Sequence, residues 1–501
     1  MLRKPLHLGL SIALLALNCL TSTPSRADFP AILTASGVKA LKLPDVRIET
    51  ADHHDGSKPN DGIRVAYMDV QGVIAGSIRF QLLLPDEWNG RFAMGGGGGL
   101  VGSVQNAARG SINEGYATVG TDTGHQGEGT DGSWALNNLE ALVNFGHLAV
   151  HRTAEVSKAL IRAYYGMEPA RSYFLGCSRG GGQAMMEAQR YPDDFDGIVA
   201  GAPAFDWTGI AALFTHIAQT MYPDPEHLSG TVLTQDDLNH LYAEIMKQVD
   251  EQDGLKDGII DDPTAVRFDL SRIPGLNDKQ RSAVRAVYEG VRNASGPIYP
   301  GFPIGAEAGP GGWFGWLVGP LAPGAVNLSF AFGTNIYKYF VFNDPEWDYS
   351  TYDFSNWERD TRLAGSTLDA KDSDLARFAS LGGKLILWHG WADAALPASA
   401  TVAYYEEVLQ SDPKAMEYAR LFLVPGCYHC GGGPGVSRVD WLQVIVDWVE
   451  TGSAPDRIIA TKSGQNGAPT MTRPLVPYPE RVEYRGSGDT NDAENFVLRA
   501  P

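Results

Sequence analysis

The segment GCSRG at residues 176–180 constrains the fold of this chain more than any other. It follows an apolar, aromatic run at residues 173–175 that is typical of a buried strand, and residues 183–189 then carry apolar side chains at helical spacing. A serine with a glycine two positions away on each side suits a sharp, strained turn from strand to helix. The segment predicts Ser178 as a nucleophile in an α/β-hydrolase fold; the alternative is an ordinary glycine-rich turn.

The rest of the 501-residue chain divides into a core and an insertion. Strand and helix patterns alternate around Ser178, which favours a parallel α/β sheet, with one helix expected over residues 141–166 and kinked or capped near 152–153. Between residues 207 and 373 this alternation gives way to amphipathic helices and aromatic, glycine-rich segments. We therefore predict a catalytic domain at 28–206 and 374–501 and a lid at 207–373. The lid's aromatic residues either line a pocket for a ring-bearing substrate or form its own core. We expect the tail from about residue 461 to cover the core without a sheet of its own.

The N-terminus has the pattern of a secretory signal peptide. Arg3 and Lys4 precede an apolar stretch at residues 8–20, and Ser25-Arg26-Ala27 offers a cleavage site. We therefore predict that residues 1–27 are removed and that the protein is secreted or periplasmic. The formal net charge of −19 argues against nucleic acid as a partner, and no later segment is apolar enough to span a membrane. The oligomeric state is not predicted.

Two further residues, Asp393 and His429, would complete a catalytic triad with Ser178. Asp393 follows a predicted strand at residues 384–388, and His429 follows another at 420–424. The order serine, aspartate, histidine, with each residue at the end of a strand, is that of an α/β-hydrolase triad. His429 would accept the proton of Ser178, and Asp393 would orient the imidazole. The alternative for Asp393 is a loop residue that caps the next helix.

A loop of five glycines, residues 95–99, follows the predicted strand at residues 91–94. Such a loop can turn backbone N–H groups into a cleft, and an α/β-hydrolase places one donor of its oxyanion hole there. We predict the N–H groups of Gly98 and Arg179 as the two donors. A flexible loop or a phosphate-binding loop is the alternative, but no Lys-Ser/Thr pair follows.

The cysteines lie beside the predicted catalytic residues. Cys177 precedes Ser178 and Cys430 follows His429, so contact between serine and histidine would bring the two cysteines within disulfide range. We predict a bridge between Cys177 and Cys430 and leave Cys427 free. A redox or zinc role for the C-x-x-C segment lacks a second cysteine or histidine pair.

Residues 250–263 form an acidic loop in the predicted lid. Aspartates alternate with glycines there, an arrangement of oxygen donors that suits a hard cation such as Ca²⁺. The spacing is not that of an EF-hand, and no glutamate closes the loop. A solvated acidic turn is the alternative.

Three of these segments, GCS at 176–178, HGWAD at 389–393 and PGCYHCGG at 425–432, resemble the tannase/feruloyl esterase family. The resemblance extends to the glycine loop, residues 122–125, the acidic loop and residues 484–496. It implies a disulfide joining the neighbours of serine and histidine. It also implies Ca²⁺ bound by Asp250, Asp253, Asp257 and the carbonyl groups of Leu255 and Ile259.

The resemblance implies an exported serine carboxylesterase that hydrolyses esters of hydroxylated or carboxylated benzoic and cinnamic acids through an acyl-enzyme. Family members often carry further cysteines where this chain has Val249, Val476 and Leu498, which weakens any transfer of lid geometry. The alternatives are an esterase or amidase acting on a non-aromatic metabolite and, from another class, a non-catalytic binding protein. The intact triad argues against the last.

Overall fold

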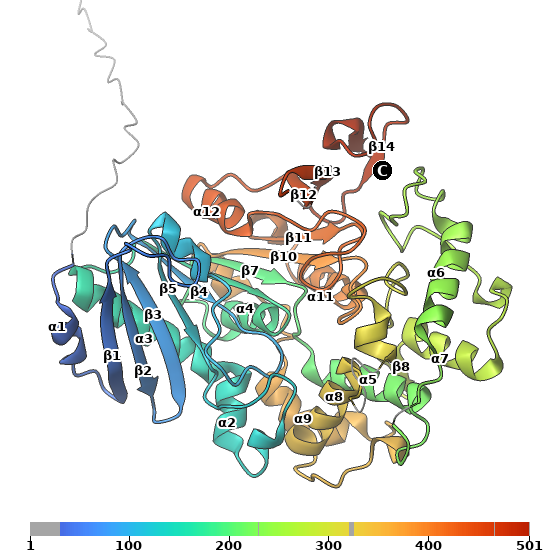
Figure 1. Cartoon of the computed structure of the whole chain (residues 1–501), viewed down its shortest axis with the longest axis horizontal. Helices are drawn as coiled ribbons and strands as arrows, with labels where there is room; N and C mark the ends of the chain where they lie inside the picture. The colour runs from blue at the N-terminus through green and yellow to red at the C-terminus, as the bar shows by residue number, and fades with distance from the viewer. Residues whose placement is uncertain (1–30, 229, 320–324, 465, 500–501) are drawn as a thin grey trace, which may run out of the picture.

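A nine-stranded mixed sheet forms the centre of the computed structural model, which describes residues 31–228, 230–319, 325–464 and 466–499 (Figure 1). The strand order is β1-β2-β3-β5-β4-β6-β7-β10-β11. Pairs from β1 to β5 are antiparallel, and those from β5 through β4 to β11 are parallel. The strands are β1 (Val46–His54), β2 (Tyr67–Ile74), β3 (Ile78–Pro85), β4 (Arg91–Gly95), β5 (Ala117–Thr121), β6 (Arg171–Cys177), β7 (Gly197–Gly201), β10 (Lys384–Gly390) and β11 (Ala419–Val424). The predicted signal peptide lies outside the described residues.

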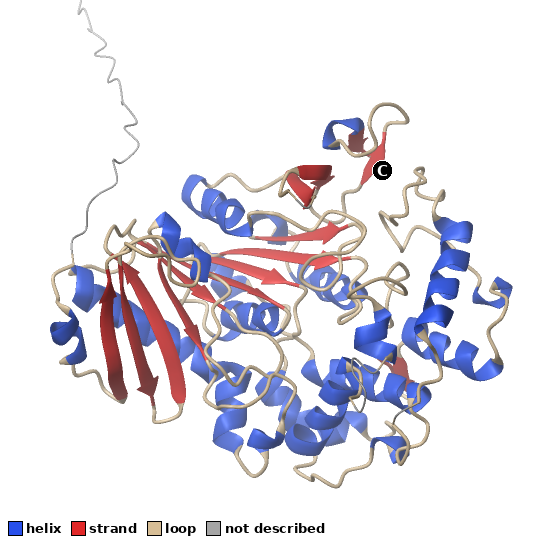
Figure 2. Cartoon of the chain, viewed as in Figure 1, coloured by secondary structure: helices blue, strands red, loops and turns tan. Residues whose placement is uncertain are grey.

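Helices cover both faces of the parallel strands (Figure 2). Because side chains alternate along a strand, Leu385 and Leu387 of β10 face one core, whereas Ile386 and Trp388 face the other. The first core includes α3 (Ala149–Tyr165), α4 (Arg179–Arg190) and α11 (Ala398–Ser411), and the second includes α12 (Trp441–Thr451). Both faces of the parallel strands are therefore apolar, which explains their nearly continuous hydrophobic sequence.

The chain between β7 and β10 forms a largely helical insert, to one side of the sheet in Figure 1. Its first helix, α5, begins with the cap Asp206 and packs against α7, α8 and α9. We call residues 207–373 the lid segment. Its elements are α5 (Trp207–Met221), α6 (Gln235–Val249), α7 (Asp278–Glu289), β8 (Val291–Asn293), β9 (Gly296–Tyr299), α8 (Leu328–Asn335) and α9 (Trp357–Leu368). The short helices α1 (Ala35–Lys39) and α10 (Ala376–Ser380) lie outside it.

The structure corrects two expectations. The tail forms two small antiparallel sheets, of β12 (Ile458–Ser463) with β13 (Pro469–Leu475) and of β14 (Val482–Tyr484) with β15 (Phe496–Leu498). The expectation of no sheet was wrong because a two-stranded ribbon has only edge strands, which tolerate proline.

The helix expected over residues 141–166 is instead α2 (Leu139–Val143), a π-helical turn (Asn144–Leu148) and α3. The irregularity therefore precedes the predicted kink. The side chain of Arg179 binds the carbonyl groups of Phe145 and Gly146 within the π-helical turn. Among the helices of the described residues, none combines the length and apolarity needed to cross a membrane.

Candidate active site

Ser178 occupies the turn between β6 and α4 in a backbone conformation that is rare for a residue with a side chain, with φ 62° and ψ −123°. The flanking glycines are required by close approach. A Cβ atom on Gly176 would lie 2.2 Å from the carbonyl oxygen of Gly180, and one on Gly180 would lie 3.2 Å from that of Gly97 in the glycine loop. Gly181, just past the motif, is also tightly packed, because its Cβ atom would lie 2.3 Å from the carbonyl oxygen of Gly201. The glycine spacing seen in the sequence therefore allows α4 to pack directly against the sheet.

Asp393 and His429, which follow β10 and β11, form an acid–base pair in which the carboxylate is buried and the imidazole is partly exposed. The Nδ1 atom of His429 lies 2.8 Å from Oδ2 of Asp393. The other carboxylate oxygen accepts the N–H groups of Ala395 and Leu396 at 2.7 and 2.9 Å. Burial opposes ionisation, but the charge of His429 and the hydrogen bonds from His429 and His389 outweigh it and hold the pKa of Asp393 well below its usual range. An ionised Asp393 accepts hydrogen bonds only, so Nδ1 of His429 carries the proton and Nε2 is left to act as a base.

His389 is a second partner of Asp393 that the sequence reasoning did not assign. Its Nε2 atom lies 3.1 Å from Oδ2 of Asp393, and its Nδ1 atom lies 2.9 Å from Oγ1 of Thr401. The imidazole is buried, so both contacts fix its ring. His389 thus positions the carboxylate of Asp393. The only sign of this contact in the sequence is that His389 lies four residues before Asp393.

Ser178 and His429 line one pocket, of about 60 Å³. No hydrogen bond joins the two side chains among the described residues, and such contacts often tighten only when substrate binds. The ring of Trp316 in the lid segment meets the His429 ring edge to face, with centroids 5.1 Å apart. The other lining residues are mostly apolar: Gly99, Arg179, Ala204, Trp207, Ile210, Phe214, Phe332, Ile336, Ala395 and Leu396.

The glycine loop lies beside this pocket, but Gly98 is engaged elsewhere. Its N–H donates to Oε1 of Gln105 at 2.8 Å, and the N–H of Gly97 donates to Oε1 of Gln183 at 3.1 Å. Gly99 is the residue of the loop that lines the pocket, with φ at 57°. Arg179 begins α4, where backbone N–H groups have no acceptor within the helix. The sequence could not distinguish Gly98 from Gly99 because five identical residues carry no positional signal.

The predicted disulfide is confirmed. Cys177 and Cys430 are bridged, with Cα atoms 5.9 Å apart, and Cys427 is a buried free thiol. The bridge joins the residue before Ser178 to the residue after His429, across a sequence separation of 253. It therefore ties together two loops that no short segment of chain connects.

Replacing both Cys177 and Cys430 by serine should lower the free energy of unfolding by about 2–5 kcal/mol, because the bridge restricts the unfolded chain. It should also lower kcat, because the His429 loop loses its covalent attachment to β6. Denaturant titration and steady-state kinetics measure the two effects. Cys427→Ala is the matched control, and an equal loss in that variant would contradict the assignment.

The acidic loop holds its carboxylates through contacts within the loop and to the tail. Asp250 accepts the N–H of Gly258 at 2.9 Å, and Asp253 accepts that of Asp261 at 3.0 Å. Asp257 accepts a hydrogen bond from Arg473 of β13 at 2.8 Å. Burial raises the pKa of Asp253, and the charges of Asp257 and Asp250 raise it further. The three carboxylates therefore lie close enough to repel one another.

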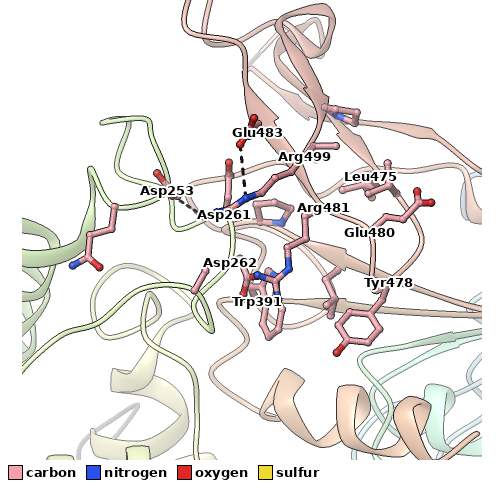
Figure 3. Close-up of a pocket in the computed structure, with 17 residues that line it drawn as sticks. Asp253, Asp261, Asp262, Trp391, Leu475, Tyr478, Glu480, Arg481, Glu483 and Arg499 are labelled. Carbon is pink, nitrogen blue, oxygen red and sulfur yellow. Dashed lines mark hydrogen bonds and ion pairs between the residues drawn. The ribbon is translucent and has the colours of Figure 1, made fainter. Parts of the chain in front are cut away.

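A cavity of about 140 Å³ separates this loop from the tail (Figure 3). Asp262 of the loop pairs with Arg481 of the tail at 2.7 Å, and Arg499 lies 3.8 Å from Glu483. Within the described residues, no group of three or more His, Cys, Asp and Glu side chains is arranged as a metal site. The loop contacts the tail through the Asp262–Arg481 and Asp257–Arg473 ion pairs.

The strand order, with a serine after β6 and an Asp–His pair after β10 and β11, defines an α/β-hydrolase. A family model described as "Tannase and feruloyl esterase" matches residues 63–498. The chain belongs to this family of carboxylic ester hydrolases.

Relatives and solved structures agree with this assignment. Mono(2-hydroxyethyl) terephthalate hydrolase of Piscinibacter sakaiensis is 35% identical, and the match covers 85% of this chain and 82% of the relative. A probable feruloyl esterase of Arthroderma benhamiae is 31% identical, covering 96% and 93%. The crystal structure of feruloyl esterase B from Aspergillus oryzae is similar with a TM-score of 0.81 at 26% identity, over 93% of this chain and 99% of that one.

Proposed function

We propose that this protein is an exported serine esterase that hydrolyses esters of aromatic acids through an acyl-enzyme. The observation that supports it most directly is the Asp393–His429 contact of 2.8 Å in the pocket that Ser178 also lines. Aromatic side chains of the lid segment, among them Trp207 and Phe214 of α5 and Trp316, give this pocket the character expected for a ring-bearing acyl group.

In the first step, Oγ of Ser178 attacks the ester carbonyl while Nε2 of His429 takes its proton. Asp393 stabilises the resulting imidazolium and keeps its ring in place. His429 then gives the proton to the departing alcohol, which leaves an acyl-enzyme on Ser178. A water molecule, activated by His429, hydrolyses the acyl-enzyme and restores the serine.

The negative charge on the carbonyl oxygen needs two donors. The N–H of Arg179 follows the nucleophile directly and lies at the positive end of α4. We assign the second donor to the N–H of Gly99 rather than Gly98, because Gln105 already occupies the Gly98 amide.

Product analysis by chromatography tests the substrate class. The panel contains methyl gallate, methyl ferulate, chlorogenate, mono(2-hydroxyethyl) terephthalate and p-nitrophenyl acetate, with the Ser178→Ala variant as the blank. We expect at least one aromatic ester to be cleaved with a higher kcat/KM than p-nitrophenyl acetate. Cleavage of p-nitrophenyl acetate alone would contradict the aromatic class while leaving the triad intact.

We infer further that the acidic loop binds Ca²⁺. Asp250, Asp253 and Asp257 would supply carboxylate oxygens, and Leu255 and Ile259 would supply carbonyl oxygens, a donor set that suits this ion. Burial is the main cause of the raised pKa of Asp253, and the charges of Asp257 and Asp250 add to it; a bound cation would offset both. The ion would stabilise the lid segment, away from the reacting atoms.

Removal of Ca²⁺ should therefore lower Tm. A ligand that binds only the folded state adds about 2.7 kcal/mol at a concentration of one hundred times its Kd. Asp253→Asn should lower both the metal content, measured by elemental analysis, and the gain in Tm on adding Ca²⁺. Glu251→Gln is the control, because Glu251 pairs with Lys256 outside the proposed donor set. Metal-free protein with a Tm that Ca²⁺ does not change would refute the assignment.

Export to an oxidising compartment would explain why Cys177 and Cys430 form a disulfide. A disulfide persists in oxidising compartments, and the Cys177–Cys430 bridge lies at the catalytic centre. Together with the predicted signal peptide at residues 1–27, this favours the periplasm or the medium. N-terminal sequencing of the protein recovered outside the cytoplasm should begin at Asp28.

A further inference from the structure

The turn at residues 99–102 presents the N–H group of Gly99, the proposed second oxyanion donor. This N–H has no acceptor among the described residues, whereas the neighbouring backbone N–H groups are engaged: those of Gly96, Gly97, Gly98 and Leu100. The backbone angle φ is 57° at Gly99, 50° at Val101 and 82° at Gly102. A valine rarely adopts such an angle, so the turn needs contacts from outside to keep its shape.

The loop after β5, residues 122–129, provides these contacts, and we call it the β5 loop. It holds Leu100 from both sides. The Leu100 N–H donates to the carbonyl oxygen of Gly129 at 2.7 Å, and the Leu100 carbonyl oxygen accepts from Nε2 of His125 at 2.8 Å. Backbone hydrogen bonds join Gly102 to the same loop. Among the described residues, His125 supplies the only side-chain hydrogen bond to this turn.

The imidazole of His125 is fixed both in orientation and in protonation. It is 7% exposed and stacks on Trp134, with ring centroids 3.7 Å apart, while the Phe145 ring meets it edge to face at 6.0 Å. Burial lowers the pKa of His125 to about 4, so the ring is neutral near pH 7. A carbonyl oxygen only accepts, so the single proton lies on Nε2, and the buried Nδ1 has no partner among the described residues. His125 is therefore a rigid donor aimed at the backbone of Leu100.

We propose that His125 is a positioning residue of the oxyanion hole: by holding Leu100, it keeps the free N–H of the adjacent Gly99 in place at the pocket. This role rests on the proposed esterase function and deepens it. Gly99 lines the pocket and His125 does not, so His125 acts on the reaction only through the backbone of the turn. An oxyanion donor is effective only where its position matches the charged oxygen of the transition state. A displaced Gly99 should therefore lower kcat and leave KM nearly unchanged.

Three substitutions of His125 separate its hydrogen bond from its ring. His125→Phe keeps an aromatic ring against Trp134 and removes the donor. His125→Gln removes the ring but places an amide N–H₂ near the position of Nε2, whereas His125→Asn places the same group near that of Nδ1, away from Leu100. We expect kcat to fall about 10- to 100-fold in the Phe and Asn variants, with KM within about threefold of wild type, because a misplaced donor costs somewhat less than a missing one. His125→Gln should recover most of the loss.

A boronic acid reports on the oxyanion hole without turnover. Phenylboronic acid accepts Oγ of Ser178 at its boron atom while His429 takes the serine proton, which gives a tetrahedral anion that resembles the transition state. Its dissociation constant should rise in the Phe and Asn variants of His125 by about the same factor as kcat falls, since both depend on the same donors. The Gln variant should bind it nearly as tightly as wild type.

A purely structural role for His125 predicts a different pattern. All three variants would then lower Tm, but kcat measured well below Tm and the dissociation constant of phenylboronic acid would stay within about twofold of wild type. That outcome overturns the proposal, and so does recovery of kcat in the Phe variant rather than the Gln variant. If His125→Phe does not fold, the Gln and Asn variants decide, because they differ only in where the amide lies.

His240→Phe is the matched control. His240 lies exposed on α6, and its Nε2 atom contacts the carbonyl oxygen of Pro274 at 2.9 Å, the same kind of hydrogen bond outside the pocket. Its loss should leave kcat and boronate binding unchanged.

Failure of the esterase function gives a distinct result. Wild-type protein would then cleave no ester of the panel and would not bind phenylboronic acid, and the role of His125 would fall with the function. If wild-type protein cleaves esters and the His125 variants follow the structural pattern, the esterase function stands and only the positioning role is wrong.

Discussion

Ser178→Ala should lower kcat by about six orders of magnitude, as loss of a nucleophile does in a serine hydrolase. The alanine variant keeps the backbone of the turn and the proposed oxyanion donors, the N–H groups of Arg179 and Gly99, so the remaining rate should report binding and these donors alone. KM should change little, because the pocket walls are untouched. Product analysis over long incubation is the measurement, since this residual rate lies below the range of a continuous assay.

Two controls separate lost chemistry from lost structure. Ser453→Ala changes an exposed serine after α12 and should keep full activity. Ser178→Gly should be as inactive as Ser178→Ala but more stable, because glycine adopts φ near 62° without the cost that a Cβ atom adds. Ester turnover by Ser178→Ala at more than about a hundredth of the wild-type rate would remove Ser178 from the mechanism.

The strain at Ser178 is maintained by its surroundings. The Ser178 N–H donates to the carbonyl oxygen of Gly201 at 3.0 Å, and its own carbonyl oxygen accepts the N–H of Ala204 at 2.9 Å. On the other side, the disulfide at Cys177 attaches the turn to the His429 loop. The neighbouring strand and the bridge therefore hold the serine while its backbone remains in an unfavourable region.

The sequence was sufficient for features that depend on local spacing. The close contact between Gly176 and Gly180 lies within the motif itself, so the glycine spacing around Ser178 is visible without the fold. The α/β sheet followed from apolar runs ending in polar residues, because parallel strands bring their carboxyl ends to one edge of the sheet. The disulfide followed from that same argument, since Cys177 and Cys430 are neighbours of residues that share the edge.

Features that depend on where individual side chains are placed, at short or long sequence separation, could not be found in this way. His389 became a partner of Asp393 only once its side chain was placed, and Gln105 binds the Gly98 amide through a fold of the loop that five glycines do not encode. The π-helical turn at Asn144–Leu148 accepts hydrogen bonds from the side chain of Arg179, more than 30 residues away. Each of these contacts joins groups whose sequence neighbours give no sign of the meeting.

Asp393→Asn should lower kcat by about 10⁴-fold, the loss seen when the same change is made in a serine protease triad. Each oxygen of Asp393 accepts two hydrogen bonds: one faces the N–H groups of Ala395 and Leu396, and the other faces His429 and His389. An asparagine has one N–H₂ group, which must face donors on one side or the other. If it faces His429, the imidazole moves its proton to Nε2 and no longer acts as a base towards Ser178.

The same geometry makes Asp393→Asn costly to stability as well as to catalysis. The charge of His429 and the hydrogen bonds from both histidines lower the pKa of Asp393 in the folded protein. The ionised carboxylate therefore stabilises the folded state at every pH above the pKa that Asp393 has in the unfolded chain. This stabilisation is lost as the pH falls through the lowered pKa of the folded state. The variant should therefore lose the most stability, relative to wild type, near neutral pH and less in acid. Denaturant titration across that pH range measures this, with the exposed Asp447→Asn as the control. A kcat within tenfold of wild type would show that His429 is oriented without Asp393. A difference in the free energy of unfolding that does not change with pH would show that the charge of the Asp393 carboxylate does not stabilise the folded state.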